Sequence, residues 1–447
     1  MEEKKDLIYG LNDRPPLRET CFAALQHLLS IFVAIITPPL IISSALKYDV
    51  QTTGFLVSMS LFVSGIATFI QSRRVGPIGT GLLCIQGTSF SFITPIIGAG
   101  MLGMVNGKMD VGLGLSYIFG GCMAASVVEM AVSRLLPYTR KVITPLVAGI
   151  EVTLIGLCLI KAGITSCGGG QTAIDNHTFG SLDNLGLAVL VLVSIIFFNR
   201  SNNRFLRMGS IVLGLLIGCV VAYCLGMIDF SKISADNPLN IPVPFKYGLH
   251  FDLGTIIALG LIYLVTAVEA FGDITANSLI SGEPVEGPVF MKRAQGGILA
   301  DGFNSMLAAV FNSFPNSIFA QNNGMIQLTG VASRYVGYYI AGALFVLGLF
   351  PVVGEFFSLI PDCVLGGATL LMFGTVAAAG IRIIASSALD RKAVLVLAIS
   401  FSMGMSVELV PAILDQMPAM VKSIFSSGIT TGGVTAMIAN ACIRIRK

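Results

Sequence analysis

Residues 314–330 read FPNSIFAQNNGMIQLTG, and they stand where the spacing of apolar runs places a membrane-spanning helix. Four residues at the centre of this stretch, Gln321 to Gly324, supply three side-chain amides and a glycine, which suit neither lipid nor a helix interior. Irregular backbone is tolerated at membrane depth only where it is buried in protein or lines a cavity. The stretch therefore predicts an interrupted span beside a polar cavity.

Charged residues are scarce along the whole chain, which indicates a membrane protein. Of the 447 residues, 54% are hydrophobic and 11% are charged. A soluble domain has about 25% charged residues, so the composition excludes an ordinary soluble enzyme. The formal net charge of +3 is too small to indicate binding to nucleic acid. The nine cysteines lack CxxC or metal-ligand spacing, which favours buried, reduced thiols.

Apolar runs divide the chain into fourteen candidate spans, each about 20 residues long as a membrane crossing requires. Two spans are weak, near 79–98 and 317–330, because polar residues interrupt them. If all fourteen cross, 21 of the 27 basic residues fall on the side of the two termini and six on the other. Short cytoplasmic loops collect Lys and Arg, so we expect both weak spans to cross and both termini to be cytoplasmic.

The two halves of the chain resemble one another. Seven spans per half is an odd number, so the second half begins on the opposite side of the membrane, which makes an inverted repeat. Chance similarity between glycine-rich helices is the alternative, but the interrupted spans are the third of each half. The predicted parts are a cytoplasmic tail (1–19), two repeats (20–228 and 253–447) and an outer connector (229–252). The repeated residues, offset by 217 positions, are Val147, Gly149, Gly163 and Ile164 against Val364, Gly366, Gly380 and Ile381.

Ionisable side chains stand inside several spans, where an unpaired charge costs about 2.5–3.5 kcal/mol. Glu269 and Asp273 are four residues apart and share one helix face. Their repulsion favours a protonated carboxyl, an arrangement that can carry a proton; a wet position at the helix end is the alternative. Asp301 either supports coupling, caps a broken helix or bonds a neighbouring Ser or Thr. For Glu129 and Glu151 we expect hydrogen bonds between helices.

Aromatic and amide side chains stand beside the two interruptions. A continuous helix is not expected around Pro95, nor around Pro315 and Gly324. Phe90 and Phe319 flank these breaks, and two aromatic faces with an amide and a carboxylate suit a flat heterocycle with polar edges. The residues themselves therefore predict a carrier for a small, polar, aromatic substrate. The first span contains the adjacent residues Gln26 and His27. We interpret His27 as a packing partner rather than as a catalytic group.

These motifs resemble those of the nucleobase/ascorbate transporter family. Residues 321–330, QNNGMIQLTG, match its signature Gln/Glu/Pro-Asn-x-Gly-x-x-x-x-Thr-Arg/Lys/Gly. The resemblance extends over nearly the whole chain and is greatest to the bacterial xanthine permeases, including the run GVASRYVG at 330–337. Further motifs that match in order are Gln26-His27, Gly87-Thr88-Ser89-Phe90, Glu269 with Gly272-Asp273, and Phe314-Pro315-Asn316.

The resemblance implies an all-α polytopic membrane protein of fourteen spans in a seven-plus-seven inverted repeat. It implies short antiparallel strands in spans three and ten, and a homodimer formed through the gate domain. The core domain would hold spans one to four and eight to eleven, about 20–133 and 253–355. The gate domain would hold the other spans, about 142–228 and 365–443.

The resemblance also implies roles for individual residues. Glu269 and Gln321 would hydrogen-bond a purine, Phe90 and Phe319 would flank it, and the backbones of Phe90 and Ala320 would add contacts. Residues implied to support proton coupling and site geometry are His27, Gln26, Ser91, Asp273, Asp301 and Asn322.

Two positions bear on which base is carried. Ser91 stands where several bacterial xanthine permeases have Asn, and the smaller side chain should admit a more oxidised purine such as uric acid. Gln321 offers both a donor and an acceptor to the paired C=O and N–H edge of an oxidised purine. We therefore rank xanthine or uric acid above uracil.

The function expected from these observations is proton-coupled import of xanthine or uric acid across the inner membrane, by an elevator-like movement of core against gate. Protons would be the coupling ion and no cofactor is expected. An uncoupled facilitator or exchanger, for uracil, guanine, hypoxanthine or a small organic anion, is the alternative. A membrane-embedded enzyme is not expected, because the sequence shows no nucleophile–base pair or metal cluster.

Overall fold

The computed structural model describes residues 7–139, 142, 144–203, 206–207, 209–229, 239, 241–385, 387–418, 421–422 and 425–443. Eight helices in this part of the chain are long and apolar enough to cross a membrane, so the chain is a membrane protein of mainly helical structure. They are α1 (Leu17–Ala45), α2 (Val50–Arg73), α4 (Val111–Thr139), α5 (Pro145–Cys167), α7 (Leu182–Asn199), α10 (Leu253–Ile280), α15 (Asp362–Ala385) and α16 (Arg391–Leu409).

Helix starts follow from local sequence. The side chain of Asp252 accepts a hydrogen bond from Thr255 N (2.7 Å) and caps α10. Thr144 caps α5 in the same way, and Pro145 follows it at the first helical position, where its missing N–H costs no hydrogen bond. Such caps set the position of each helix along its own sequence, and hence of the side chains that it carries inward.

The other helices complete the bundle. The pair α13 (Arg334–Gly348) and α14 (Pro351–Ser358) bends by 78° at its break, and could count as a ninth crossing. The count of fourteen spans stays a prediction, because several of these helices are shorter than a crossing. The remaining elements are α3 (Ile93–Met101), α6 (Gly170–Asp175), α9 (Ser210–Cys224), α11 (Gly287–Val310), α12 (Ala320–Thr329), α18 (Gly428–Cys442) and the 3-10 turns η1 (Phe90–Phe92) and η3 (Pro411–Leu414).

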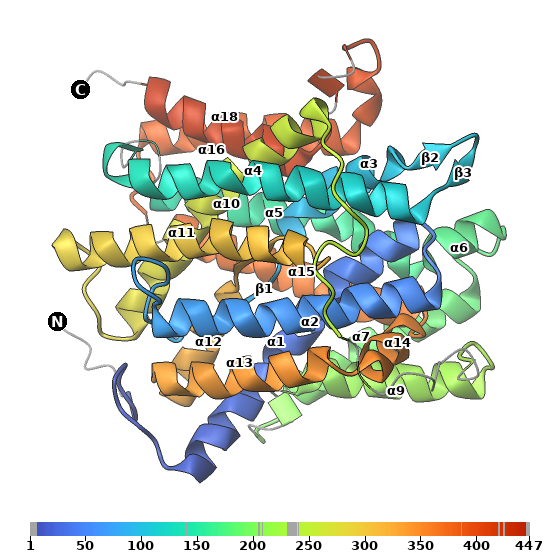
Figure 1. Cartoon of the computed structure of the whole chain (residues 1–447), viewed down its shortest axis with the longest axis horizontal. Coiled ribbons are helices and arrows are strands. Elements are labelled where there is room, and N and C mark those ends of the chain that lie inside the picture. Colours follow the sequence, from blue (N-terminus) through green and yellow to red (C-terminus); the bar gives the residue numbers. More distant parts are fainter. Residues whose placement is uncertain are drawn as a thin grey trace.

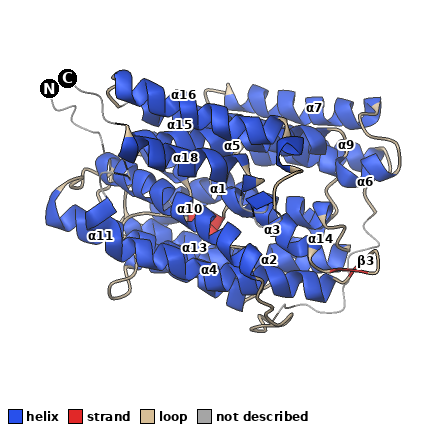
Figure 2. Ribbon diagram, turned by 90° about the horizontal axis from the view of Figure 1, so that it is seen from above, coloured by secondary structure: helices blue, strands red, loops and turns tan. Residues whose placement is uncertain are grey.

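The helices pack mainly within two groups (Figures 1 and 2). In one group, α2 lies against α13 and α14, and α4 lies against α10 and α11. In the other, α5 lies along α15, α7 along α9, and α16 along α18. The close approach of α5 to α15 requires small residues, since a Cβ added at Gly156 would lie 2.3 Å from the nitrogen of Ala377. Contacts between the groups run through α10 with α5 and α18, and through α1 with α6 and α9.

Two short strands meet inside the bundle. β1 (Gln86–Thr88) pairs antiparallel with β4 (Asn316–Ile318), with Gly87 opposite Ser317, and both strands are buried. Figure 2 shows this pair at the centre of the molecule, between the helices. A second pair, β2 (Met104–Val105) with β3 (Lys108–Met109), forms an exposed hairpin. Both termini lie at the same end of the molecule (Figures 1 and 2).

The breaks do not lie quite where the sequence placed them. Around Pro315 the chain is not helical, as expected, because strand β4 follows at Asn316. Gly324 lies inside helix α12 and Pro95 inside helix α3, so the expectation of a break at these two residues is wrong. Pro95 is the third residue of α3, where a missing N–H costs nothing. A single glycine costs a helix only about 1 kcal/mol, which packing can offset. The interruption is instead the extended strand and turn that precede Ile93 and Ala320.

Candidate functional site

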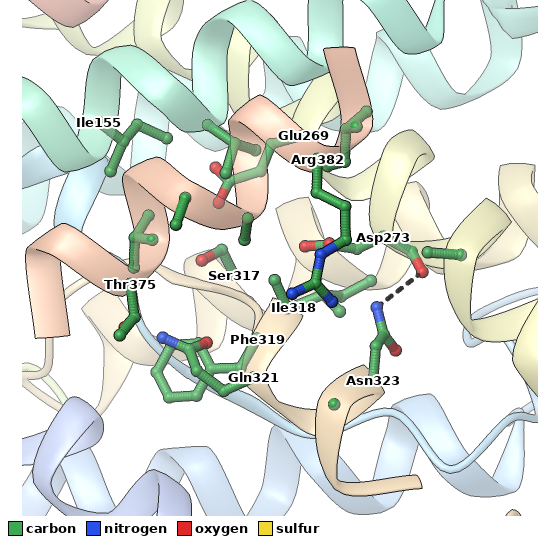
Figure 3. A pocket seen from close by; sticks show the side chains of 18 of the residues that line it. Ile155, Glu269, Asp273, Ser317, Ile318, Phe319, Gln321, Asn323, Thr375 and Arg382 are labelled. Atoms are coloured by element: carbon green, nitrogen blue, oxygen red, sulfur yellow. Dashed lines mark hydrogen bonds between the residues drawn. The ribbon is translucent and has the colours of Figure 1, made fainter. Parts of the chain in front are cut away.

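A cavity of about 410 Å³ lies where β4 and the start of α12 face helices α10 and α15 (Figure 3). The lining comes from η1, α5, α10, β4, α12 and α15, so both helix groups contribute to it. Its wall contains seven of the eleven site residues expected from the sequence: Phe90, Ser91, Glu269, Asp273, Phe319, Ala320 and Gln321. A cavity of this size with few, convergent polar groups is typical of a small-molecule site.

Two carboxyl groups of α10 face the cavity. Ser91 Oγ donates to Glu269 Oε2 over 3.4 Å, which links the end of the β1 segment to α10. Asp273, one turn further along, is only 2% exposed, and its Oδ2 has no hydrogen-bond partner in the described structure. The alternative of a wet position at the helix end is therefore wrong for Asp273.

The strand pair holds the two phenylalanines. Ser89 N donates to Pro315 O (2.8 Å) and Phe319 N donates to Ile85 O (3.0 Å), so the pairing continues beyond both strands. Phe319 is the residue before α12, and no side chain caps the first N–H groups of that helix. The ring of Phe90 meets Phe373 of α15 edge-on, with centroids 5.4 Å apart. These backbone bonds fix the phenylalanine positions more firmly than side-chain packing alone would.

Four expected site residues lie outside the cavity lining. Three of them, His27, Asn322 and Asp301, are buried and make side-chain hydrogen bonds to other residues. His27 Nδ1 donates to Asn322 Oδ1 (2.9 Å), and Asn322 Nδ2 donates to Leu83 O (2.6 Å). His27 thus joins α1 to α12, as expected of a packing partner. Asp301 accepts from Gln71 Nε2 (3.3 Å), so the expectation of a Ser or Thr partner is wrong.

The fourth, Gln26, is buried and lines a separate cavity near Tyr9, Arg18 and Thr329. Its Nε2 has no hydrogen-bond partner in the described structure.

Hydrogen bonds between helices occur at one of the two other membrane acids. Thr266 Oγ1 of α10 donates to Glu129 Oε1 of α4 (3.2 Å), as expected. Glu151 of α5 is fully buried, and neither of its carboxyl oxygens has a partner in the described residues, so the expectation is wrong there. Its side chain lies against Gly433 of α18.

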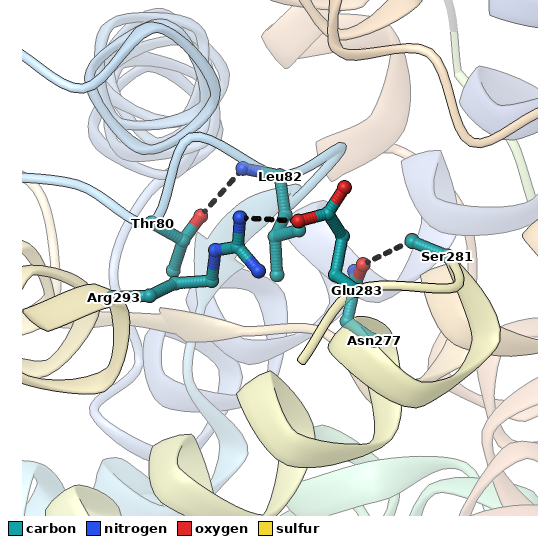
Figure 4. A network of polar contacts seen from close by, with 6 residues as sticks. All are labelled: Thr80, Leu82, Asn277, Ser281, Glu283 and Arg293. Carbon is teal, nitrogen blue, oxygen red and sulfur yellow. Dashed lines mark hydrogen bonds and ion pairs between the residues drawn. The ribbon is translucent and has the colours of Figure 1, made fainter. Parts of the chain in front are cut away.

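A polar network supports the segment that leads into β1 (Figure 4). The carbonyl of Leu83 accepts hydrogen bonds from Asn277 Nδ2 of α10 (2.8 Å) and from Asn322 Nδ2 of α12. Ser281 Oγ donates to the Oδ1 of Asn277 (3.1 Å), which fixes the orientation of that amide. Nearby, Arg293 Nη2 of α11 contacts Glu283 Oε2 at 2.9 Å. The segment before β1 is thereby tied to α10, and α10 to α11 by the ion pair at its end.

Some lining residues were not anticipated from the sequence. Asn323 Nδ2 donates to the backbone carbonyl of Asp273 (3.3 Å; Figure 3) and so binds α12 to α10. Thr375 and Arg382 reach the cavity from α15. Thr375 is a lone hydroxyl residue in the apolar run LLMFGTVAAAGI (370–381), which gives little signal, and Arg382 was counted only among the basic residues on the side of the termini. In the residues that the structure describes, no group of His, Cys, Asp or Glu is arranged to hold a metal ion.

Comparisons with known proteins agree with this arrangement. Residues 18–413 match the sequence model described as the Permease family. The chain is 49% identical to the xanthine permease XanP of Escherichia coli over 98% of its length and 95% of the relative's. It is 33% identical to the uric acid permease PucJ of Bacillus subtilis, over 95% and 92% of the two chains. The transmembrane domain of a cyanobacterial bicarbonate transporter, BicA, aligns with a TM-score of 0.58 at 15% identity, covering 96% and 99% of the two chains, which shows a shared fold.

Proposed function

We propose that this chain, which belongs to the Permease family of nucleobase/ascorbate transporters, is a proton-coupled symporter for xanthine or uric acid. One observation carries the proposal: two phenylalanines, an amide and a carboxyl converge on one cavity between the paired strands and α10. Two relatives are a xanthine permease and a uric acid permease, and their activities support the substrate class. The substrate would lie in this cavity, at the centre of the membrane.

The cavity offers a purine both flat and polar contacts. Phe90 and Phe319 present aromatic faces, which pack well against a planar heterocycle. Gln321 can donate and accept at once, and Glu269 can accept or, when protonated, donate. The uncapped N–H groups at the start of α12 add donors with a partial positive charge. An oxidised purine, whose ring edge alternates C=O and N–H groups, satisfies this set better than a base with fewer carbonyls.

Proton coupling would rest on Glu269. The hydrogen bond that Glu269 accepts from Ser91 is long, at 3.4 Å. The ionisable residue one helical turn away is Asp273, an acid, which does not neutralise an ionised Glu269. Two ionised carboxyls in one cavity repel each other, so substrate and proton are expected to bind together. The helix group of α1–α4 and α10–α14 would act as the core and the other group as the gate, the core moving against it with the substrate. Both termini would face the cytoplasm, and homodimerisation would use the gate.

Purified protein in liposomes gives the test. Labelled xanthine should accumulate above equilibrium when the lumen is more alkaline than the outside, and a protonophore should abolish the accumulation. The Glu269→Gln variant should fold and bind but should not accumulate substrate, because the amide cannot exchange a proton. Equilibration of xanthine that ignores the gradient would favour the uncoupled alternative, and normal accumulation by the variant would remove Glu269 from the coupling step.

A further inference from the structure

Arg382 places a positive charge in the wall of the cavity. It lies near the end of α15, and its side chain extends into the cavity that Glu269 and Asp273 also line (Figure 3). Among the described lining residues it is the one cation. Its side chain is exposed, and within the described structure it makes no hydrogen bond or ion pair.

Membrane topology alone does not account for this placement. A basic residue retained only to orient a span is expected to lie in a loop or at the lipid headgroups. Arg382 instead shares a wall with Asn323 and Gln327 of α12, next to residues expected to bind substrate. Two acids and one unpaired cation therefore face the same space, and they come from different helix groups: the acids from α10 and the cation from α15.

We propose that Arg382 is a specificity-determining residue, whose guanidinium binds the ionised form of the purine substrate. The inference rests on the proposed function and extends it to the charge state of the substrate. Oxidised purines are weak acids whose monoanion spreads its charge over ring nitrogen and carbonyl oxygen atoms in one plane. A guanidinium donates two parallel N–H bonds to such an edge and remains charged at any physiological pH.

Because two acids line the cavity, binding of an anionic substrate there requires a nearby cation. The titratable groups that face the space are Glu269 and Asp273, both on α10; the residues contributed by α12 and β4 are neutral amides, hydroxyl and apolar groups. When either carboxyl is ionised, a purine anion meets like charge, and an arginine in the same lining offsets that repulsion. Because α15 belongs to the other helix group, this contact would also depend on how the two groups are positioned.

The test compares one substrate in two charge states. Binding of labelled xanthine to the purified full-length chain is measured at a pH below and a pH above its first ionisation. The variants are Arg382→Gln, Arg382→Lys and, as a control, Arg391→Gln, which removes an exposed charge at the start of α16 outside the cavity lining. Thermal unfolding of each variant confirms that it is folded. The affinity of each variant is divided by the wild-type affinity at the same pH, which removes the effect of carboxyl titration that the wild type and the variants have in common.

Arg382→Gln should weaken binding of the xanthine anion by at least about tenfold and should change binding of neutral xanthine by less than about twofold. Arg382→Lys should retain part of the anion affinity, and the control should match wild type. Equal losses for both charge states, or no loss for either, would overturn the proposal and assign Arg382 a structural role or a pairing with Asp273. Wild-type protein that binds xanthine in neither state would overturn the proposed function, and the inference with it.

Discussion

Replacing Gly87 with alanine would test whether the strand pair sets the position of the Phe319 ring. Gly87 lies in β1 opposite Ser317, and Phe319 follows two residues later in the partner segment. A Cβ added at Gly87 would lie 2.6 Å from Cζ of Phe319 and 2.7 Å from Cγ1 of Ile35. Ordinary carbon contacts are about 3.5–4.0 Å, so both side chains lie too close to the added Cβ and each must move by about 1 Å.

The structure indicates which of the two side chains can move more easily. Ile35 is fully buried in α1, whereas the Phe319 ring borders the cavity, so the ring has space on one side. The backbone of Gly87 is held by its pairing and cannot retreat easily. Overpacking of this kind costs about 1–3 kcal/mol. If the cost falls on the bound state, in which substrate occupies the space that the ring would enter, affinity should drop by about fivefold to about 150-fold.

The assay is xanthine binding to purified Gly87→Ala, with thermal unfolding measured alongside. Gly98→Ala is the matched control, because a Cβ at Gly98 of α3 would meet no atom within 4 Å and alanine favours the helix. Phe319→Leu in the Gly87→Ala background should recover stability without recovering affinity, since the shorter side chain relieves the clash but loses the aromatic face. Wild-type affinity and stability in Gly87→Ala would refute the reasoning.

Three further outcomes are expected. Ser91→Asn should narrow the cavity and lower the potency of uric acid relative to xanthine in uptake competition; an unchanged ratio would contradict this. Lys47, in the turn after α1, donates to Asp175 of α6 and holds the pKa of that carboxyl below its ordinary value. The bridge is therefore retained above the lowered pKa and lost only as the pH falls through it, so the effect of Lys47→Gln on transport rate should be constant from about pH 8 to about pH 5; an effect that fades at mildly acidic pH would exclude the bridge as its cause. Arg293→Gln should lower stability by about 1–3 kcal/mol, because Glu283 would lose its partner at 2.9 Å; equal thermal unfolding of the variant and wild type would show the pair to be dispensable.

Sequence reasoning located the interrupted spans because their residues are unusual for lipid. Amides, glycine and proline near 79–98 and 317–330 had no place in ordinary crossings, and the four-residue spacing of Glu269 and Asp273 fixed a shared face. Both inferences depend on local chemistry and on the helical period, which a single sequence contains. The cavity lining includes both acids and both phenylalanines that these patterns indicated.

The details that sequence reasoning missed depend on partners far away in the chain. The amides of Asn322 and Asn323 allow a helix through Gly324 because they bond to carbonyls of Leu83 and Asp273. Nothing near 322 in the sequence shows that those carbonyls are at hand. The position of Arg382 in the cavity lining was missed for the same reason, since only the packing of α15 turns its side chain into the cavity.

The distribution of hydrogen bonds favours movement between the two helix groups over movement within them. Three buried hydrogen bonds support the residues expected to bind substrate: His27 to Asn322, Asn322 to Leu83, and Asn277 to Leu83. They join α1, α10, α12 and the segment before β1, which all belong to one helix group. Breaking any of them would leave buried polar atoms unsatisfied, at about 1–3 kcal/mol each. Between the groups, the bridge of Lys47 to Asp175 joins two exposed side chains, so water replaces that contact at little cost. Ser44 Oγ of α1 also donates to Asp362 Oδ2 of α15 (2.8 Å), a partly buried bond that the same movement would break. The proposed core can therefore move with its ligands intact, and the proposed contact of Arg382 with an anion would then be made and broken with each movement.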